Sequence, residues 1–317
     1  MPGTRFDRFE SWRDSMVNRP AIRRLDRWST PHTHPGTSAG RIVVMKLRVL
    51  AVFVLRRLAQ GGGRRAALQG TRSLGGDAAG KTVLVVGSGP SASTLDVSAV
   101  ASAQRSGELV VVATNFFLAS DMAQTITPDY LVWSDEIFHP RNREQNQESW
   151  AALSTHPSIT LVSPWTWRKD IEAMALPHTV SYFDDDTLEG WSRNISPLKP
   201  RGYQGSTGQK AIAFAVHLGG TSTAIIGIDL SYFRHFSVDS DNRLYRHPVH
   251  ITGTDTGVAE LTPNTLHGLS DELYSTANNF RYLHTHFARF PIVNLDPHSL
   301  VDAFPKVSDS PWVNSGP

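Results

Sequence analysis

The sequence of 317 residues contains no cysteine and only five methionines. Without a thiol, the chain cannot form disulfides, bind zinc through thiolates or use a cysteine nucleophile. Its 13 histidines include no H-E-x-x-H pair, so the helical zinc motif is missing too. A chain free of cysteine suits the cytoplasm, and we expect that localisation, with peripheral binding to the inner face of the membrane as an addition.

Long apolar runs are absent as well. Residues 41–58, RIVVMKLRVLAVFVLRRL, combine basic and apolar side chains, and their longest uncharged apolar run is Val49 to Leu55. That run is far shorter than the roughly 20 residues that span a bilayer, and the segment lacks the features of a signal peptide. It is typical of a helix that lies on an anionic membrane surface. The alternative is a helix that packs on the main domain.

Acidic residues are scarce in the first part of the chain. Residues 1–80 contain 15 Lys and Arg against 5 Asp and Glu, whereas the remainder contains 16 against 24. We therefore predict a basic N-terminal arm over 1–80, partly disordered or membrane-peripheral, and a globular domain over 81–317. The arm has few aromatic residues between its arginines and the domain is acidic, so no nucleic-acid partner is expected.

From residue 81 onward, apolar strands alternate with helical patterns. The predicted buried strands are KTVLVVG, ELVVVATN, DYLVWSD, ITLVS, HTVSYF, TSTAIIGIDL and PIVNLD, and the predicted helices cover 91–107, 208–220, 270–290 and 299–304. This alternation predicts an α/β fold with a Rossmann-like, mostly parallel sheet flanked by helices. Two long segments without periodicity interrupt it, 183–206 and 231–266, and we interpret the second as a lid.

Polar motifs follow the strands at the edge where α/β sheets bind ligands. The first is GSGPS, which comprises Gly87, Ser88, Gly89, Pro90 and Ser91. A glycine turn between a strand and a helix lets backbone N–H groups approach a phosphate. The alternative is a glycine turn without a ligand.

Two further absences reduce the number of ligand classes that this loop could bind. A dinucleotide site needs an acid near the end of the second strand, where this chain has Thr114 and Asn115. The lysine of the P-loop is missing too. Both NAD and P-loop chemistry are therefore disfavoured.

Two later motifs add candidate residues. Ser206, Thr207 and Gly208 open an alanine-rich helix, whose N-terminus can bind a carboxylate or phosphate, although capping alone explains these residues equally well. Asp229 ends a core strand and could hold a ribose, a proton or a metal, and Tyr232 could donate to a leaving phosphate. An ordinary strand-end turn is the alternative for this pair.

Acids and histidines in the two irregular segments are the remaining candidates. FDDDT at 183–187 has the composition of a metal motif but also that of a solvated loop. A histidine of the lid could act as a general base near neutral pH. The histidines in or beside the lid are His235, His247, His250 and His267.

In order and spacing, five motifs resemble those of the bacterial sialyltransferases of glycosyltransferase family 42. They are VVGSGPS, ATNFF, STGQKAIAFAVHLGG, IIGIDLSYF and NLDPHSLVDAF. The resemblance covers residues 82 to about 305 and leaves the arm unmatched. It implies an inverting transferase that uses CMP-sialic acid without a metal or another cofactor.

The resemblance also implies a role for each candidate. The glycine loop and Asn115 would hold the nucleotide, while Ser206 and Thr207 would meet the carboxylate of the donor sugar. Tyr232 and Tyr245 would stabilise the departing phosphate, and His267 would deprotonate the acceptor. The chain departs from the family at Ser88, where asparagine is usual, and in the spacing of both tyrosines and the histidine.

A second resemblance leads to a different enzyme. GSGPS, TPDYLVWSD and GIDLSY are similar to motifs of the domain family that contains archaeal 6-hydroxymethylpterin diphosphokinases, which use ATP and magnesium. That resemblance implies roles for Asp135 and Asp229 at a magnesium site. A non-catalytic nucleotide-binding protein on a membrane is the third alternative.

We therefore predict a glycosyltransferase that moves a sialic acid-like sugar from a CMP donor to a glycan hydroxyl. The expected partners are the nucleotide-sugar donor, the glycan acceptor and, through residues 41–58, an anionic membrane surface. A homo-oligomer is left open.

Overall fold

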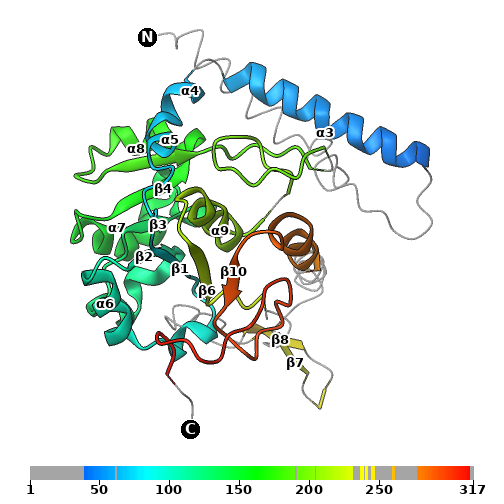
Figure 1. Cartoon of the computed structure of the whole chain (residues 1–317). Helices are drawn as coiled ribbons and strands as arrows, with labels where there is room; N and C mark the ends of the chain where they lie inside the picture. Colours follow the sequence, from blue (N-terminus) through cyan, green and yellow to red (C-terminus); the bar gives the residue numbers. More distant parts are fainter. Residues whose placement is uncertain are drawn as a thin grey trace.

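The computed structural model describes residues 39–60, 63–189, 191–203, 205–230 and 277–314, with the short pieces 236–238, 240–241, 244–246 and 259–260. At its centre is a seven-stranded sheet in the order β10-β6-β1-β2-β3-β4-β5 (Figure 1). All strand pairs in this sheet are parallel. The strands are β1 (Thr82–Val86), β2 (Leu109–Thr114), β3 (Tyr130–Val132), β4 (Thr160–Pro164), β5 (Val180–Phe183), β6 (Ser222–Ile226) and β10 (Ile292–Asn294).

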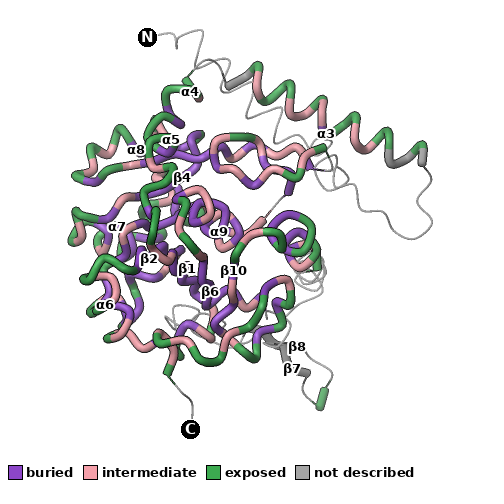
Figure 2. The backbone as a smooth tube through the Cα atoms, viewed as in Figure 1, coloured by how far each residue is buried: buried purple, intermediate pink, exposed green. Residues whose placement is uncertain are grey.

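Helices cover both faces of the sheet, which confirms the predicted α/β fold. One face carries α6 (Val97–Arg105), α7 (Gln147–Ser154) and α8 (Arg168–Ala173), and the other carries α9 (Thr207–His217). The described residues also form the short helical segments η1 (Pro90–Thr94), η2 (Asn115–Ala119), η3 (Asp121–Gln124), η4 (Glu136–Phe138), η5 (Pro140–Asn146), η6 (Trp165–Trp167) and η8 (Leu283–Phe287), and residues 277–282 are helical. The buried strands run through the middle of the molecule in Figure 2.

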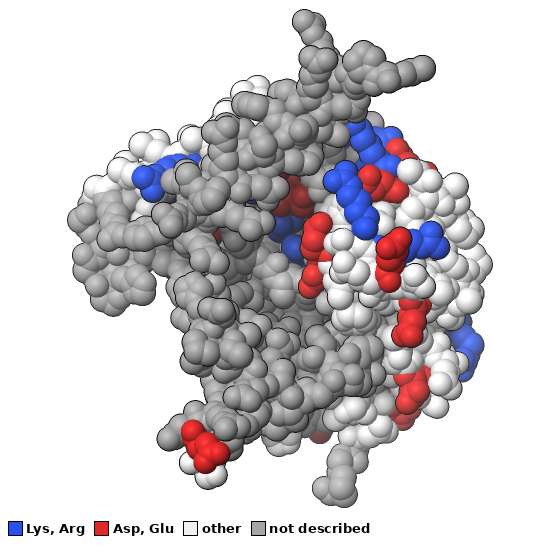
Figure 3. All heavy atoms as spheres, turned by 180° about the vertical axis from the view of Figure 1, so that it is seen from behind, with Lys and Arg blue, Asp and Glu red and all other residues white. Residues whose placement is uncertain are grey.

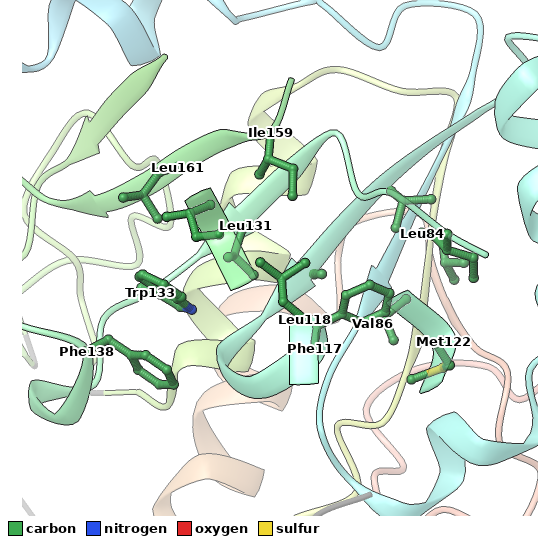
Figure 4. Close-up of a cluster of buried hydrophobic side chains, with 14 of the residues drawn as sticks. Leu84, Val86, Phe117, Leu118, Met122, Leu131, Trp133, Phe138, Ile159 and Leu161 are labelled. Atoms are coloured by element: carbon green, nitrogen blue, oxygen red, sulfur yellow. The ribbon is translucent and has the colours of Figure 1, made fainter. Parts of the chain in front are cut away.

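Alternate residues of each strand supply the two apolar cores, as expected for a parallel sheet buried on both faces. Figure 3 shows acidic and basic side chains interspersed on the surface opposite the view of Figure 1. In β1, Leu84 and Val86 pack toward α6 and α7, whereas Val83 and Val85 pack toward α9. Figure 4 shows the core on the α6 and α7 side of the sheet, where aromatic side chains pack at the end near η2 and η4.

The described residues before residue 81, which are 39–60 and 63–80, pack on the domain. It forms α3 (Ala39–Gln60), α4 (Arg64–Ala67) and α5 (Gln69–Ser73). Leu68 is buried in the apolar core that also contains residues of α6, α7 and α8, and the buried Thr71 donates a hydrogen bond of 2.6 Å to the carbonyl of Tyr182 in β5. The domain boundary at residue 81 stays a prediction, but these contacts join residues 64–80 to the sheet.

Three expected elements differ in the structure. Residues 299–304 form no helix; they follow β10 as irregular chain anchored by the buried Val301 and Phe304. The predicted helix 91–107 is split into η1, a short 3-10 segment, and α6, because Asp96 caps α6 by accepting from the backbone of Ser98 and Ala99. The described end of the predicted helix 270–290 finishes in the π-helical turn η8.

The predicted lid is only partly described. Its described pieces pair as a three-stranded antiparallel sheet made of β7 (Phe236–Val238), β8 (Leu244–Arg246) and β9 (Ala259–Glu260). The sequence pattern showed no periodicity there because each strand has only two or three residues.

Candidate functional site

A cleft opens where the strand order reverses. The chain leaves β1 toward β2 and returns on the other side of β1 as β6, so the loops after β1 and β6 separate at this edge. Ligands of open α/β sheets bind at such a point. The cleft has a volume of about 80 Å³ and is lined by Gly87, Ser88, Gly89, Pro90, Thr114, Asn115, Ser206, Thr207, Gly208, Gly227, Ile228, Asp229 and Leu230.

Nine of the ten predicted nucleotide-binding residues line this one cleft, and the tenth, Ser91, is bonded to one of them. They come from the loop after β1, the end of β2, the N-terminus of α9 and the loop after β6. Sequence reasoning did not single out Thr114, Gly227, Ile228 and Leu230 as lining residues. Each lies within two positions of a predicted residue, which is the signal that could have found them.

The loops after β1 and β6 touch through their backbones. A Cβ atom on Gly87 would lie 2.1 Å from the carbonyl oxygen of Gly227, and one on Gly89 would lie 2.7 Å from the same oxygen. Gly227 itself has a φ of 71°, a backbone conformation that residues with a side chain rarely adopt. The glycines of GSGPS are therefore required by this contact between two loops, whether or not a ligand is bound.

Asp229 joins the same two loops through hydrogen bonds. Its carboxylate accepts from the backbone N–H of Ser91 at 3.0 Å and from the Ser91 hydroxyl, which in turn accepts from the Gly227 N–H at 2.8 Å. The N–H of Ser91, which sequence reasoning assigned to a phosphate, thus already has an anionic partner. A carboxylate at this end of the cleft disfavours a phosphate beside it.

The opposite end of the cleft is the N-terminus of α9. Ser206 is the N-cap, and its hydroxyl accepts from the Gln209 N–H at 3.5 Å. The partial positive charge of a helix start favours an anion there. Thr207 and Gly208 of the first turn line the cleft as well.

A partly buried cation, Lys210, lies behind this turn. The ammonium group of Lys210 donates to the hydroxyl of Ser134 at 2.9 Å, and that hydroxyl lies 2.7 Å from the hydroxyl of Thr207. Burial, and secondarily the nearby Arg201, lower the pKa of Lys210 to about 7. Lys210 therefore titrates near neutral pH and connects to the cleft through two hydroxyl groups.

Asn115 supplies an unused hydrogen-bond acceptor to the cleft. Its backbone adopts a φ of 49°, and its carbonyl accepts from the indole N–H of Trp133 at 2.9 Å. Asparagine tolerates this left-handed conformation better than most residues. Its side-chain oxygen Oδ1 is buried and has no hydrogen-bond partner among the described residues, which suits a ligand with an amino or hydroxyl group.

The three predicted catalytic residues are not placed in the cleft by the structure. Tyr232 and His267 lie outside the described residues, as do His235, His247 and His250. Tyr245 belongs to β8, where it pairs with Ser237 of β7 and Glu260 of β9. Their roles stay predictions.

The FDDDT segment is held by arginines. Asp184 is fully buried and pairs with Arg57 at 2.8 Å and with Arg64, and Asp186 pairs with Arg57 at 2.7 Å. Arg201 donates to the carbonyls of Asp184 and Asp185 at 2.7 and 2.9 Å. These guanidinium groups, rather than solvent, surround two of the three carboxylates.

A second and larger cavity of about 360 Å³ lies between α3 and the segments 185–189 and 201–210. Its lining includes Asp185, whose pKa is raised to about 6 by burial, and Lys210 from behind the α9 turn. Sequence reasoning did not foresee this cavity because the residues that line it come from distant parts of the chain.

Searches for family models and for curated relatives found no match. Among solved structures, the Maf glycosyltransferase from Magnetospirillum magneticum AMB-1 is 13% identical with a TM-score of 0.45, over 96% of this chain and 47% of that protein. The chain thus spans about half the length of that glycosyltransferase. The sialyltransferase CstII from Campylobacter jejuni, solved with the substrate analogue CMP-3FNeuAc, is 14% identical with a TM-score of 0.43, over 74% of this chain and 88% of that protein.

Proposed function

We propose that this chain is an inverting, metal-independent glycosyltransferase that moves a sialic acid-like sugar from a CMP donor to a hydroxyl of a glycan acceptor. One observation carries the proposal. Nine residues predicted from motifs spread over 140 positions of sequence line a single cleft at the reversal point of the sheet. That is the edge at which nucleotide ligands of open α/β sheets bind.

Charge orients the donor in this cleft. The phosphate and the sugar carboxylate would lie toward Ser206 and Thr207, where the start of α9 is positive and Lys210 stands behind. The ribose hydroxyls and the amino group of the base are hydrogen-bond donors, so they would lie toward Asp229 and the free oxygen of Asn115. This arrangement modifies the sequence-based assignment, which put the phosphate at the glycine loop.

The reaction in this proposal is a single displacement. The acceptor oxygen forms a bond to the anomeric carbon while the bond from that carbon to the phosphate oxygen breaks, and its electron pair leaves with CMP. His267 takes the acceptor proton, and Tyr232 and Tyr245 donate hydrogen bonds to the departing phosphate. Attack on the face opposite the leaving group inverts the anomeric configuration.

A thermal-shift panel tests the ligand class. CMP or CDP should raise the melting temperature, whereas ATP with magnesium should not. Thr207→Val, which removes a cleft hydroxyl with little change of shape, should weaken the CMP shift, and Thr155→Val on the exposed end of α7 serves as the control. Stabilisation by ATP with magnesium alone would favour the diphosphokinase alternative.

Turnover separates an enzyme from a binding protein. Incubation with CMP-sialic acid should release CMP, at an equal rate with and without EDTA, and His267→Ala should slow the transfer to a glycan. A chain that binds CMP but never releases it from the donor would be the non-catalytic alternative. Loss of release in EDTA would contradict metal independence.

A further inference from the structure

The second cavity has the size and the lining of a ligand site. Its volume of about 360 Å³ lies within the range of roughly 300–1,000 Å³ that is typical of small-molecule pockets. One wall is the inward side of α3, with Val49, Val52 and Phe53, and the opposite wall is the polar surface of the domain. Because α3 forms one wall, the cavity exists only while that helix stays docked.

The cavity adjoins the proposed nucleotide cleft. Gly205 and Lys210 line the cavity, while Ser206, Thr207 and Gly208, which lie between them in sequence, line the cleft. The two spaces are therefore separated by a single helical turn. A sugar attached to a phosphate at the start of α9 would lie beside this turn.

The polar wall offers hydrogen-bond acceptors. Asp185 and Glu189 line the cavity, and each has a buried oxygen, Oδ1 and Oε2, without a hydrogen-bond partner in the described part of the chain. Their other oxygens accept from the hydroxyls of Thr166 and Tyr282. Unpaired buried acceptors are costly, and a ligand with hydroxyl groups would satisfy them.

The combination fits a sugar ring better than an anion. A pyranose presents hydroxyl donors around its edge and an apolar C–H face, which match carboxylate oxygens on one wall and Phe53 with Val52 on the other. A phosphate or carboxylate would meet the carboxylates of Asp185, Asp186 and Glu189, which offset the cations Arg56, Arg201 and Lys210 of the same lining. The guanidinium of Arg201, also in the lining, is already bonded to two backbone carbonyls.

We infer that this cavity binds the sugar unit of the acceptor that receives the transferred group. The inference rests on the proposed glycosyltransferase function and adds to it a place and a chemical class for the acceptor. Asp185 and Glu189 then hold acceptor hydroxyls, and α3 becomes part of the substrate site rather than an appendage.

Saturation-transfer NMR on the full chain tests the inference, with galactose, N-acetylglucosamine, lactose and N-acetylneuraminic acid as probes. At least one neutral sugar should give a signal. Val52→Trp, which fills the cavity, should reduce that signal at least fivefold, whereas Leu55→Trp on the 65% exposed outer side of the same helix should leave it unchanged. Asp185→Asn, which removes the charge and replaces one acceptor oxygen with an NH2 donor, should weaken binding about tenfold, as expected for a lost charge-assisted hydrogen bond.

Parallel CMP titrations keep the two proposals distinct. Val52→Trp and Asp185→Asn should retain the CMP thermal shift of the wild type. The inference is overturned if none of the three neutral sugars binds, or if both variants bind them as the wild type does. If CMP fails to stabilise any of the proteins while sugar binding still depends on Val52 and Asp185, the proposed donor is wrong and the sugar site stands.

Discussion

Replacing Lys210 with methionine should stabilise the protein below neutral pH. The ammonium of Lys210 is buried beside the guanidinium of Arg201, and its pKa falls from the ordinary 10.5 to about 7, mainly through loss of solvation. Asp185 and Asp135 oppose the shift but do not cancel it. Methionine has a similar length and no charge, so it removes the cost of burying a cation.

The size of the effect follows from the pKa shift. The unfolded chain keeps this proton up to about pH 10.5, whereas the folded chain releases it near pH 7. Between these values the unfolded state binds more protons, so the free energy of unfolding rises with pH. A shift of about 3.5 units corresponds to about 5 kcal/mol as an upper limit, at 1.36 kcal/mol per unit. The free energy of unfolding of Lys210→Met should therefore exceed that of the wild type by up to this amount at pH 6. The difference should shrink toward pH 10.

Urea unfolding followed by circular dichroism at intervals from pH 6 to pH 10 measures this difference. The exposed Lys199→Met is the matched control for the loss of one positive charge, and its difference from the wild type should stay small at every pH. The reasoning would be refuted if the free energies of unfolding of Lys210→Met and the wild type differed by less than about 1 kcal/mol at pH 6. A difference that does not change with pH would refute it too.

Two further perturbations test other parts of the structure. Gly87→Ala should destabilise the fold by about 1–3 kcal/mol in urea unfolding, because the new methyl group meets the backbone of the loop after β6, whereas Gly63→Ala, which meets nothing, should be neutral. The outer side of α3 exposes a stripe that includes Leu47 and Leu55, 55% and 65% exposed, on a helix without acidic residues. Flotation with anionic phosphatidylglycerol vesicles should recover the full chain, and Leu47→Asp with Leu55→Asp should abolish recovery. The control variant Leu300→Asp, which changes an exposed apolar residue outside α3, should be recovered like the wild type. Equal recovery with neutral vesicles would contradict the membrane prediction.

The sheet was predictable because its strands are short runs of apolar residues, many of them β-branched, that end in glycine or a polar residue. A parallel strand buried on both faces leaves such a run in the sequence. The helix expected over 299–304 was wrong because its apolar residues, Val301 and Phe304, anchor an irregular chain to the core. An i, i+3 spacing alone does not distinguish these two outcomes.

The cleft was predictable to the extent that its residues sit at strand ends, since the ends of parallel strands meet at one edge. The hydrogen bonds within it were not. Nothing in the sequence pairs Ser91 with Asp229, which lie 138 positions apart. Lys210 belongs to the motif STGQKAIAFAVHLGG, but its hydrogen bond to Ser134 depends on how α9 crosses the end of β3.

The buried carboxylate of Asp184 has a consequence for where the folding unit begins. Its two cationic partners, Arg57 and Arg64, both precede the predicted boundary at residue 81. A chain shortened to that boundary would lose both counter-ions, and removal of one partner of a buried ion pair typically costs about 3–5 kcal/mol. Removal of residues 1–75 would therefore test folding and membrane binding at the same time. The shortest fragment suited to crystallisation or to assays of the isolated domain should start ahead of α3, so that helix and domain fold as one unit.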